Sequence, residues 1–196
     1  MCNDIRMKFT EAQAKAVAMF SSPAFIREIE EEDPAMKKHL NLLKTMNQCG
    51  YITTNSQSGK KTSGKKSAID GKPFETIERA YIIGFMLEVD AIQFIKNLGI
   101  FTDKNAVYVP YCSDDIHLPA SLDIPLTITK TGDITKVVTH QSTTYPESQW
   151  HQERKQAKIN KSEKIVYIFC WDTKWNRNAS SATGLFTDVI KTLKSL

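Results

Sequence analysis

The feature that most restricts how this chain can fold is an apolar segment near its carboxyl end. Residues 165–171 read Ile-Val-Tyr-Ile-Phe-Cys-Trp, an almost uninterrupted run of β-branched, aromatic and other apolar side chains. A run of this length and composition is typical of a strand that is buried on both sides within a sheet. We therefore expect a sheet with this strand at its centre.

Several other segments have the composition of strands. Residues 51–54 and 78–86 are rich in β-branched and aromatic side chains, and we expect them to pair antiparallel across a long loop. Residues 106–109 predict a further strand. Residues 126–129 and 134–138 alternate around a Lys-Thr-Gly-Asp turn, which predicts a β-hairpin with one face in water.

Helix signals occupy the first fifty residues and the carboxyl end. Thr10 and Gln13 form a capping box, and the sequence Ser-Ser-Pro at 21–23 ends that helix and begins the next. Asp33 before Pro34 predicts the start of a third helix, which ends at Gly50 and buries a stripe made of Met36, Leu40, Leu43 and Met46. We expect His39, beside this stripe, at the boundary of the core or on the surface. Further helices are expected from Asp90 to Gly99 and from Ser181 onward.

Together these elements predict an α+β fold. The 196 residues are enough for one domain with a substantial core, and we expect a single domain over residues 1–196. Its helices should cover one face of a mixed, mostly antiparallel sheet.

Composition excludes several classes of protein. The chain is 41% hydrophobic and 24% charged, as in ordinary globular proteins, and no apolar run approaches the ~20 residues of a membrane-spanning helix. The first residues lack the pattern of a signal peptide, so we expect a cytoplasmic protein with no membrane partner. The four cysteines form no Cys-x-x-Cys pair, which favours reduced thiols and no metal site. No cofactor is expected.

A lysine-rich segment is the first candidate for function. Residues 55–73 are rich in Lys, Ser and Gly, and predict a flexible surface loop. Residues 59–65 match the Gly-x-x-x-x-Gly-Lys spacing of a phosphate-binding loop, but Lys66 stands where a magnesium-binding hydroxyl is needed. The lysines of this segment could still close over a phosphate or grip a nucleic-acid backbone; they are Lys60, Lys61, Lys65, Lys66 and Lys72.

A second candidate is the polar strand end just before that segment. The motif Gly-Tyr-Ile-Thr-Thr-Asn-Ser-Gln at 50–57, followed by Arg-Ala at 79–80 and Gly-Phe at 84–85, resembles an uncharacterised domain family of actinobacterial and large-DNA-virus proteins. The similarity covers residues 35–110, the family-like core. No activity is established for this family, so the resemblance implies none.

The resemblance does imply a site. Thr54, Ser56, Gln57 and Arg79 would meet across the paired strands, where an arginine beside hydroxyl and amide groups suits a carboxylate, a phosphate or a ribose. The alternative is that Arg79 pairs with Glu78 or Glu75 on a solvent-exposed face.

Other polar groups give weaker signals. Asp114, Asp115 and His117 could begin a metal site, although a polar loop explains them as well. Glu147 and His151 would share a helix face near His140, but their Glu-x-x-x-His order is not that of a hydrolytic zinc motif. Basic residues at 152–161 and at 174–177, the latter including a tryptophan, would suit nucleic acid.

Three hypotheses follow. The first is a binding domain for a phosphate-containing or other anionic ligand, either a small molecule or a nucleic acid, that uses Thr54, Ser56, Gln57 and Arg79 with Lys60 and Lys65 on a closing loop. The second is a small enzyme that acts on a nucleotide-like compound with His117 or His140 as acid–base group. The third is a structural or virion assembly protein, which predicts an exposed apolar patch. If the viral resemblance holds, the protein would reside in the host cytoplasm or in the virion.

Overall fold

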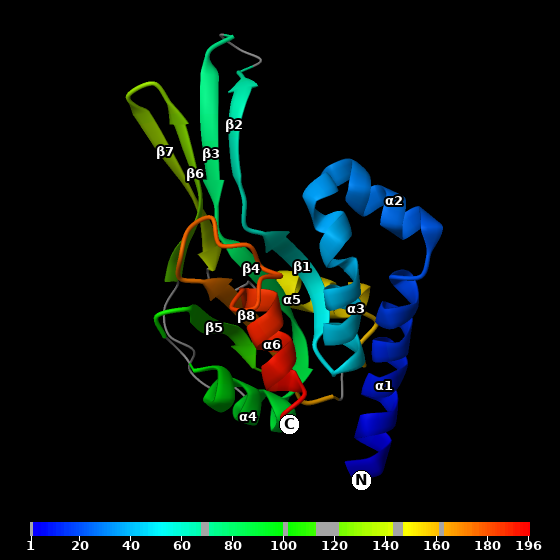
Figure 1. The fold of residues 1–196 in the computed structure, drawn as a ribbon. Coiled ribbons are helices and arrows are strands. Elements are labelled where there is room, and N and C mark those ends of the chain that lie inside the picture. The colour runs from blue at the N-terminus through cyan, green and yellow to red at the C-terminus, as the bar shows by residue number, and fades with distance from the viewer. Residues whose placement is uncertain (1, 68–70, 100–101, 113–121, 143–146, 161–162) are drawn as a thin grey trace.

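The computed structural model describes residues 2–67, 71–99, 102–112, 122–142, 147–160 and 163–196. Six α-helices and two four-stranded sheets make up these residues, which confirms the α+β prediction (Figure 1). Every strand pairing among them is antiparallel.

The first sheet, sheet A, forms the centre of the molecule. Its strands lie in the order β1-β4-β8-β5; they are β1 (Ile52–Ser58), β4 (Ala80–Leu87), β8 (Ile165–Asp172) and β5 (Asn105–Cys112). Strand β8 lies in the interior of the sheet and every one of its residues is buried, which confirms the prediction of a central strand. The predicted antiparallel pairing of residues 51–54 with 78–86 is also confirmed, as β1 with β4.

Both faces of sheet A are covered. One face packs against α3 (Leu40–Gln48), α4 (Glu88–Leu98) and α6 (Leu185–Leu193), which contribute Met46, Phe94 and Phe186 to the core. The other face packs against Phe9 and Ala12 of α1 (Cys2–Met19) and against Ile124 of β6 (Leu122–Thr131). The expectation that helices cover one face is therefore wrong. The reason is that β4 and β8 carry large apolar residues on alternate sides, so neither side can be left in water.

The second sheet, sheet B, projects from this body (Figure 1). Its strands lie in the order β2-β3-β6-β7; they are β2 (Lys61–Lys66), β3 (Pro73–Glu78), β6 (Leu122–Thr131) and β7 (Ile134–Ser142). The chain passes from β1 into β2 across Gly59 and Lys60, and it returns from β3 into β4 across Arg79. One long hairpin thus runs through both sheets. The predicted hairpin of residues 126–138 is confirmed by the pairing of β6 with β7.

The prediction of a loop over residues 55–73 is wrong for most of its length. Residues 55–58 belong to β1 and Lys61–Lys66 form β2, while 68–70 lie outside the described residues. Lysine, serine and glycine are poor strand formers on their own. Strand β2 forms because β3 supplies a partner in register, with Ile77 opposite Lys61 and Phe74 opposite Lys65.

Further helical segments lie before α3 and before β8. After α1 come α2 (Pro23–Glu32) and a 3₁₀ turn, η1 (Pro34–His39), and α5 (Glu147–Gln156) precedes β8. The helix predicted from Asp33 begins as this 3₁₀ turn, with Asp33 accepting a hydrogen bond of 3.0 Å from the Ala35 backbone amide. His39 is fully buried against the edge of the Phe186 ring, so its predicted boundary or surface position is wrong. His39 is the last residue of η1 and the residue that precedes α3, so it lies at the junction of the two helical segments.

Candidate functional site

The polar residues of β1 point in different directions. The register places Ser56 opposite Ile82 and Gln57 opposite Tyr81, and these two partners belong to opposite faces of sheet A. A bulge between Thr53 and Asn55 interrupts this alternation at Thr54. The structure therefore does not gather Thr54, Ser56 and Gln57 on one surface.

Two of these polar side chains are engaged within the sheet. The Thr54 hydroxyl lies 2.9 Å from the Tyr167 hydroxyl, and it donates a longer hydrogen bond of 3.3 Å to the carbonyl oxygen of Ile83. The Gln57 side-chain amide donates a hydrogen bond of 3.0 Å to the carbonyl oxygen of Arg79. These contacts stabilise the bulge and the crossing point between the sheets.

Arg79 is held by an aromatic ring. Its guanidinium carbon lies 4.2 Å from the centroid of the Trp175 ring, a cation–π contact. Burial lowers the pKa of Arg79, and the nearby Asp172 carboxylate opposes that shift. The alternative that Arg79 pairs with Glu75 or Glu78 is not seen. Both glutamates lie near lysines instead: Glu75 is 2.7 Å from Lys61, and Glu78 is 3.9 Å from Lys60.

A polar network fastens the segment after β8 to sheet A. The Arg177 guanidinium forms an ion pair with the fully buried Asp172 and donates hydrogen bonds of 3.1 Å to Asn105 Oδ1 and 2.8 Å to the carbonyl oxygen of Lys104. Burial raises the pKa of Asp172, and the hydrogen bond from Arg177 opposes the rise. This network is structural: its charged groups already have partners. In the sequence, only Arg177 of this network carried a signal, as a base beside a tryptophan.

The two lysines of the predicted site lie far from each other along the hairpin. Lys60 lies 2.7 Å from Asp33 and anchors the base of sheet B, so it does not sit on a closing loop. Lys65 is exposed near the far end of β2, opposite Phe74. The six residues of the predicted site therefore do not converge.

The structure does gather positive charge on the outer part of sheet B. Residues 60–73 contain five lysines and, as acid, Asp70 alone. Lys65, Lys66 and Lys72 are exposed, as are Lys130 and Lys136 on the neighbouring hairpin of β6 and β7. The strand register distributes these five side chains over both faces of the outer part of sheet B, and we call them together the lysine surface.

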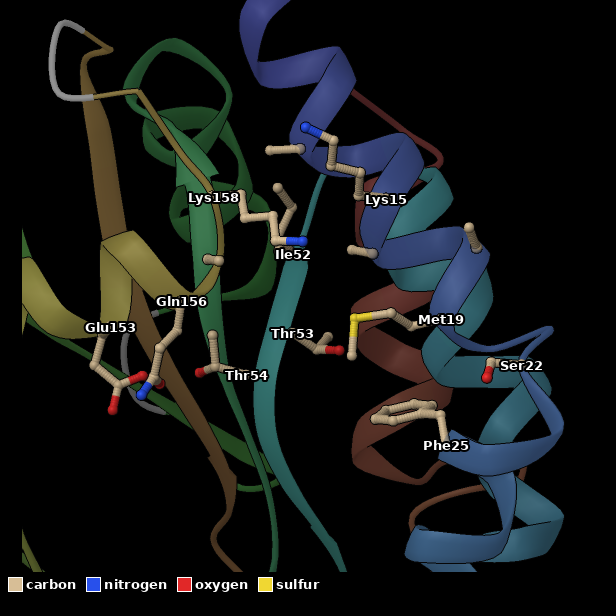
Figure 2. Close-up of a pocket in the computed structure, with 14 residues that line it drawn as sticks. Lys15, Met19, Ser22, Phe25, Ile52, Thr53, Thr54, Glu153, Gln156 and Lys158 are labelled. Carbon is tan, nitrogen blue, oxygen red and sulfur yellow. The ribbon is translucent and has the colours of Figure 1, made fainter.

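A cavity of about 540 Å³ lies on the other side of β1, between α1, β1 and the end of α5 (Figure 2). Thr53 and Thr54 form part of its wall. A smaller cavity of about 210 Å³ shares Phe25, Thr53 and Thr54 with it and extends along β1 as far as Ser56. Thr54 and Ser56 thus line cavities, although not together with Arg79. The larger cavity is built from three distant segments, and no local sequence motif marks it.

Most of the candidate catalytic and metal-binding residues cannot be placed. Asp114, Asp115 and His117 lie outside the described residues, as do the side chains of His140 and Glu147, while His151 is exposed. The described residues contain no group of three His, Cys, Asp or Glu side chains that could hold a metal ion. Burial raises the pKa of the Cys170 thiol to about 12, which removes it as a nucleophile at neutral pH.

Comparison of the sequence with protein-family models and with curated proteins finds no match. The resemblance of residues 35–110 therefore stays a prediction. Among the described helices, none has the length and apolar character needed to cross a membrane.

Proposed function

We propose that this protein binds an anionic polymer, a nucleic-acid backbone, through the lysine surface of sheet B. The observation that carries the proposal is the placement of exposed lysines on a sheet that projects from the body (Figure 1). A projecting ribbon can approach a polyanion without obstruction by the rest of the molecule. Each lysine that neutralises a phosphate releases a counterion, which favours binding at low salt.

The distribution of charge along sheet B supports this use. At the base, Lys60 and Lys61 are compensated by Asp33 and Glu75, at 2.7 Å in each case. Toward the tip, Lys65 and Lys66 have no ion-pair partner among the described residues. Ion pairs among the described residues are therefore concentrated at the base of sheet B, although Lys65 still opposes the rise that burial causes in the pKa of Glu78.

The shape of the hairpin supports a grooved partner. A two-stranded β-ribbon fits the major groove of B-form DNA, and the outer end of β2 and β3, where Lys65 and Lys66 pair with Phe74 and Pro73, extends as such a ribbon beyond the pairing of β3 with β6. Fully exposed aromatic rings are missing from the described part of this ribbon, since Phe74 is half-buried. Binding should thus depend on the backbone charge and little on the base sequence.

The test is fluorescence anisotropy with a labelled DNA duplex of about 20 base pairs at salt concentrations of about 50 to 200 mM. Replacing Lys65, Lys66 and Lys72 by glutamine should weaken binding at least tenfold at the lowest salt. The slope of log affinity against log salt should fall by up to about 3.

The matched control replaces three exposed lysines of α4 and the carboxyl-terminal segment, Lys96, Lys191 and Lys194, by glutamine. This variant loses the same charge on the opposite end of the molecule and should bind the duplex almost as well as the unmodified protein. Equal losses in the two variants, or no measurable binding, would reject the proposal.

A second candidate function, assembly with other proteins, is favoured by one observation. Strand β7 forms an edge of sheet B and exposes three large apolar side chains: Ile134 at 70%, Val137 at 49% and Val138 at 48%. Such residues on an unpaired edge suit contact with another chain. Light scattering on the protein over a range of concentrations tests it, since a constant monomer mass would exclude self-assembly through β7.

A further inference from the structure

The cavity between α1, β1 and the end of α5 has the dimensions of a small-molecule site. Its volume of about 540 Å³ lies within the ~300–1,000 Å³ typical of ligand pockets. It is open on one side, and Figure 2 shows its wall formed by α1 and α2 on one flank and by β1 and the end of α5 on the other. The lysine surface of sheet B does not contribute to it.

The hollow exists because small residues line it. Ala12, Ala16 and Ala18 of α1 and Ala157 after α5 face or border the space, where larger side chains would have filled it. Ile52 and Phe25 complete an apolar wall, and Met19 is left 50% exposed beside it. An exposed methionine next to an alanine-lined hollow is well suited to adapt to an apolar ligand.

Charged groups stand at its two ends. Lys15 of α1 and Lys158 after α5 enter one end from opposite walls, and Glu153 and Gln156 lie further along (Figure 2). Neither lysine has an ion-pair partner among the described residues, and Glu153 has none there either. Burial raises the pKa of Glu153. The ammonium groups of Lys15 and Lys158 therefore favour an anionic group at one end of the cavity. The Glu153 carboxyl group disfavours an anionic group at the other end.

The backbone at Lys158 adds an independent observation. Its φ is 57°, a left-handed conformation that is uncommon for residues other than glycine and asparagine. It follows the last turn of α5, with the Lys158 amide bonded to the Lys155 carbonyl and the Ile159 amide to the Arg154 carbonyl, a position that glycine usually occupies. A lysine there incurs a conformational cost and brings an ammonium group to the cavity.

From these features we infer that the cavity binds an amphipathic monoanion, an aliphatic carboxylate whose head contacts Lys15 and Lys158. The apolar chain of such a ligand lies against Met19, Phe25 and Ile52. The hydroxyl groups of Thr53 and Ser22 offer further hydrogen bonds within the same wall. Glu153 disfavours a second anionic group, which separates this ligand from nucleotides and other polyanions.

Isothermal titration calorimetry with decanoate, kept below its micelle concentration at neutral pH, tests the inference. Decanoate should bind with one-to-one stoichiometry, whereas decyltrimethylammonium, which has the same chain and the opposite charge, should bind at least tenfold more weakly. Decanol tests the contribution of the chain alone. Equal binding of the cation and the carboxylate, or no binding of either, would overturn the inference.

Two variants locate the binding. Lys158→Met should weaken decanoate about tenfold, the loss of one charge-assisted hydrogen bond, and leave decanol unchanged. The matched control is Lys155→Met, in the last turn of α5 but outside the cavity lining, and it should change neither affinity. Ala16→Trp should fill the hollow and abolish binding of both. If Ala16→Trp fails to fold, the two lysine variants still test the site. Identical decanoate affinities of Lys158→Met and Lys155→Met would reject it.

Discussion

The Lys60 ammonium lies 2.7 Å from the Asp33 carboxylate, and this ion pair joins the base of sheet B to the start of η1. The same Asp33 oxygen accepts a hydrogen bond of 3.0 Å from the Ala35 amide. One carboxylate thus both caps a helical turn and anchors the projecting hairpin.

Asp33→Ala should therefore lower the free energy of unfolding by about 2 kcal/mol, because it removes the cap and leaves the half-buried Lys60 without its nearest partner. Asp33→Asn is the matched control: it keeps a capping oxygen and should lose less than about 1 kcal/mol. Urea denaturation measures both. Equal losses would mean that the cap contributes nothing.

Gly84→Ala should be among the most damaging single substitutions in sheet A. An added Cβ would lie 2.2 Å from the Ile52 carbonyl oxygen, where β1 and β4 pair. Backbone would have to move, and we expect a loss of about 3 kcal/mol or more. Gly132→Ala, in the turn between β6 and β7, has open space around the added atom and a φ of 57°, so it should cost only about 1 kcal/mol. Thermal unfolding of the two variants gives the comparison.

His39 makes stability depend on pH. Burial lowers its pKa from 6.5 to about 4, helped by Lys38 and opposed by Asp33. The unfolded chain therefore takes up a proton on His39 at a higher pH than the folded protein does. The resulting stability is fully present above pH 6.5 and is lost as the pH falls toward about 4, by on the order of 3 kcal/mol.

Denaturation across this pH range checks the prediction against His39→Leu, which cannot titrate. The variant should lose less stability on acidification than the unmodified protein, since unfolding no longer protonates a side chain at position 39. Parallel pH profiles would show that His39 does not titrate differently in the two states.

Arg79 and Trp175 should be energetically coupled. A double-mutant cycle with Arg79→Met and Trp175→Leu should give a coupling energy of about 1 kcal/mol, from the cation–π contact. Pairing Arg79→Met with Glu75→Gln supplies the control, with a coupling near zero. The duplex affinity of folded Arg79→Met should be unchanged, because Arg79 lies outside the lysine surface. A large loss of duplex affinity would instead show that Arg79 takes part in binding, as the sequence predicts.

Strong periodic signals were sufficient for the core of the fold. The apolar run of β8 predicted its strand, and the stripe of Met36, Leu40, Leu43 and Met46 predicted the buried side of the third helix, although that helix begins as the 3₁₀ turn η1. Strand β2 was missed because its stability depends on pairing with β3 and not on its own lysine-rich composition. The surface or boundary position predicted for His39 was wrong for a related reason. A single polar residue forms no periodic pattern, and the burial of His39 depends on its packing against Phe186 of α6.

The candidate site was less predictable than the fold. Thr54, Ser56 and Gln57 are neighbours in sequence, but only Thr54 and Ser56 line the same small cavity, while Gln57 bonds to the backbone of Arg79 instead. The cavity beside β1 joins residues from the amino-terminal helix, β1 and the end of α5, a juxtaposition that only tertiary packing creates. The sequence shows that Lys15, Glu153 and Lys158 are charged, but it does not show that they line one cavity.

Among the described strands, β2 and β7 form the two edges of sheet B, and each could template the addition of a strand from another molecule. On β2 the exposed lysines repel an incoming copy of the same edge, so they act as gatekeepers against aggregation whatever else they bind. On β7 a single lysine, Lys136, stands among exposed isoleucine and valine side chains. Colloidal stability should consequently fall as salt screens these charges, and β7 should be the edge through which the protein first precipitates.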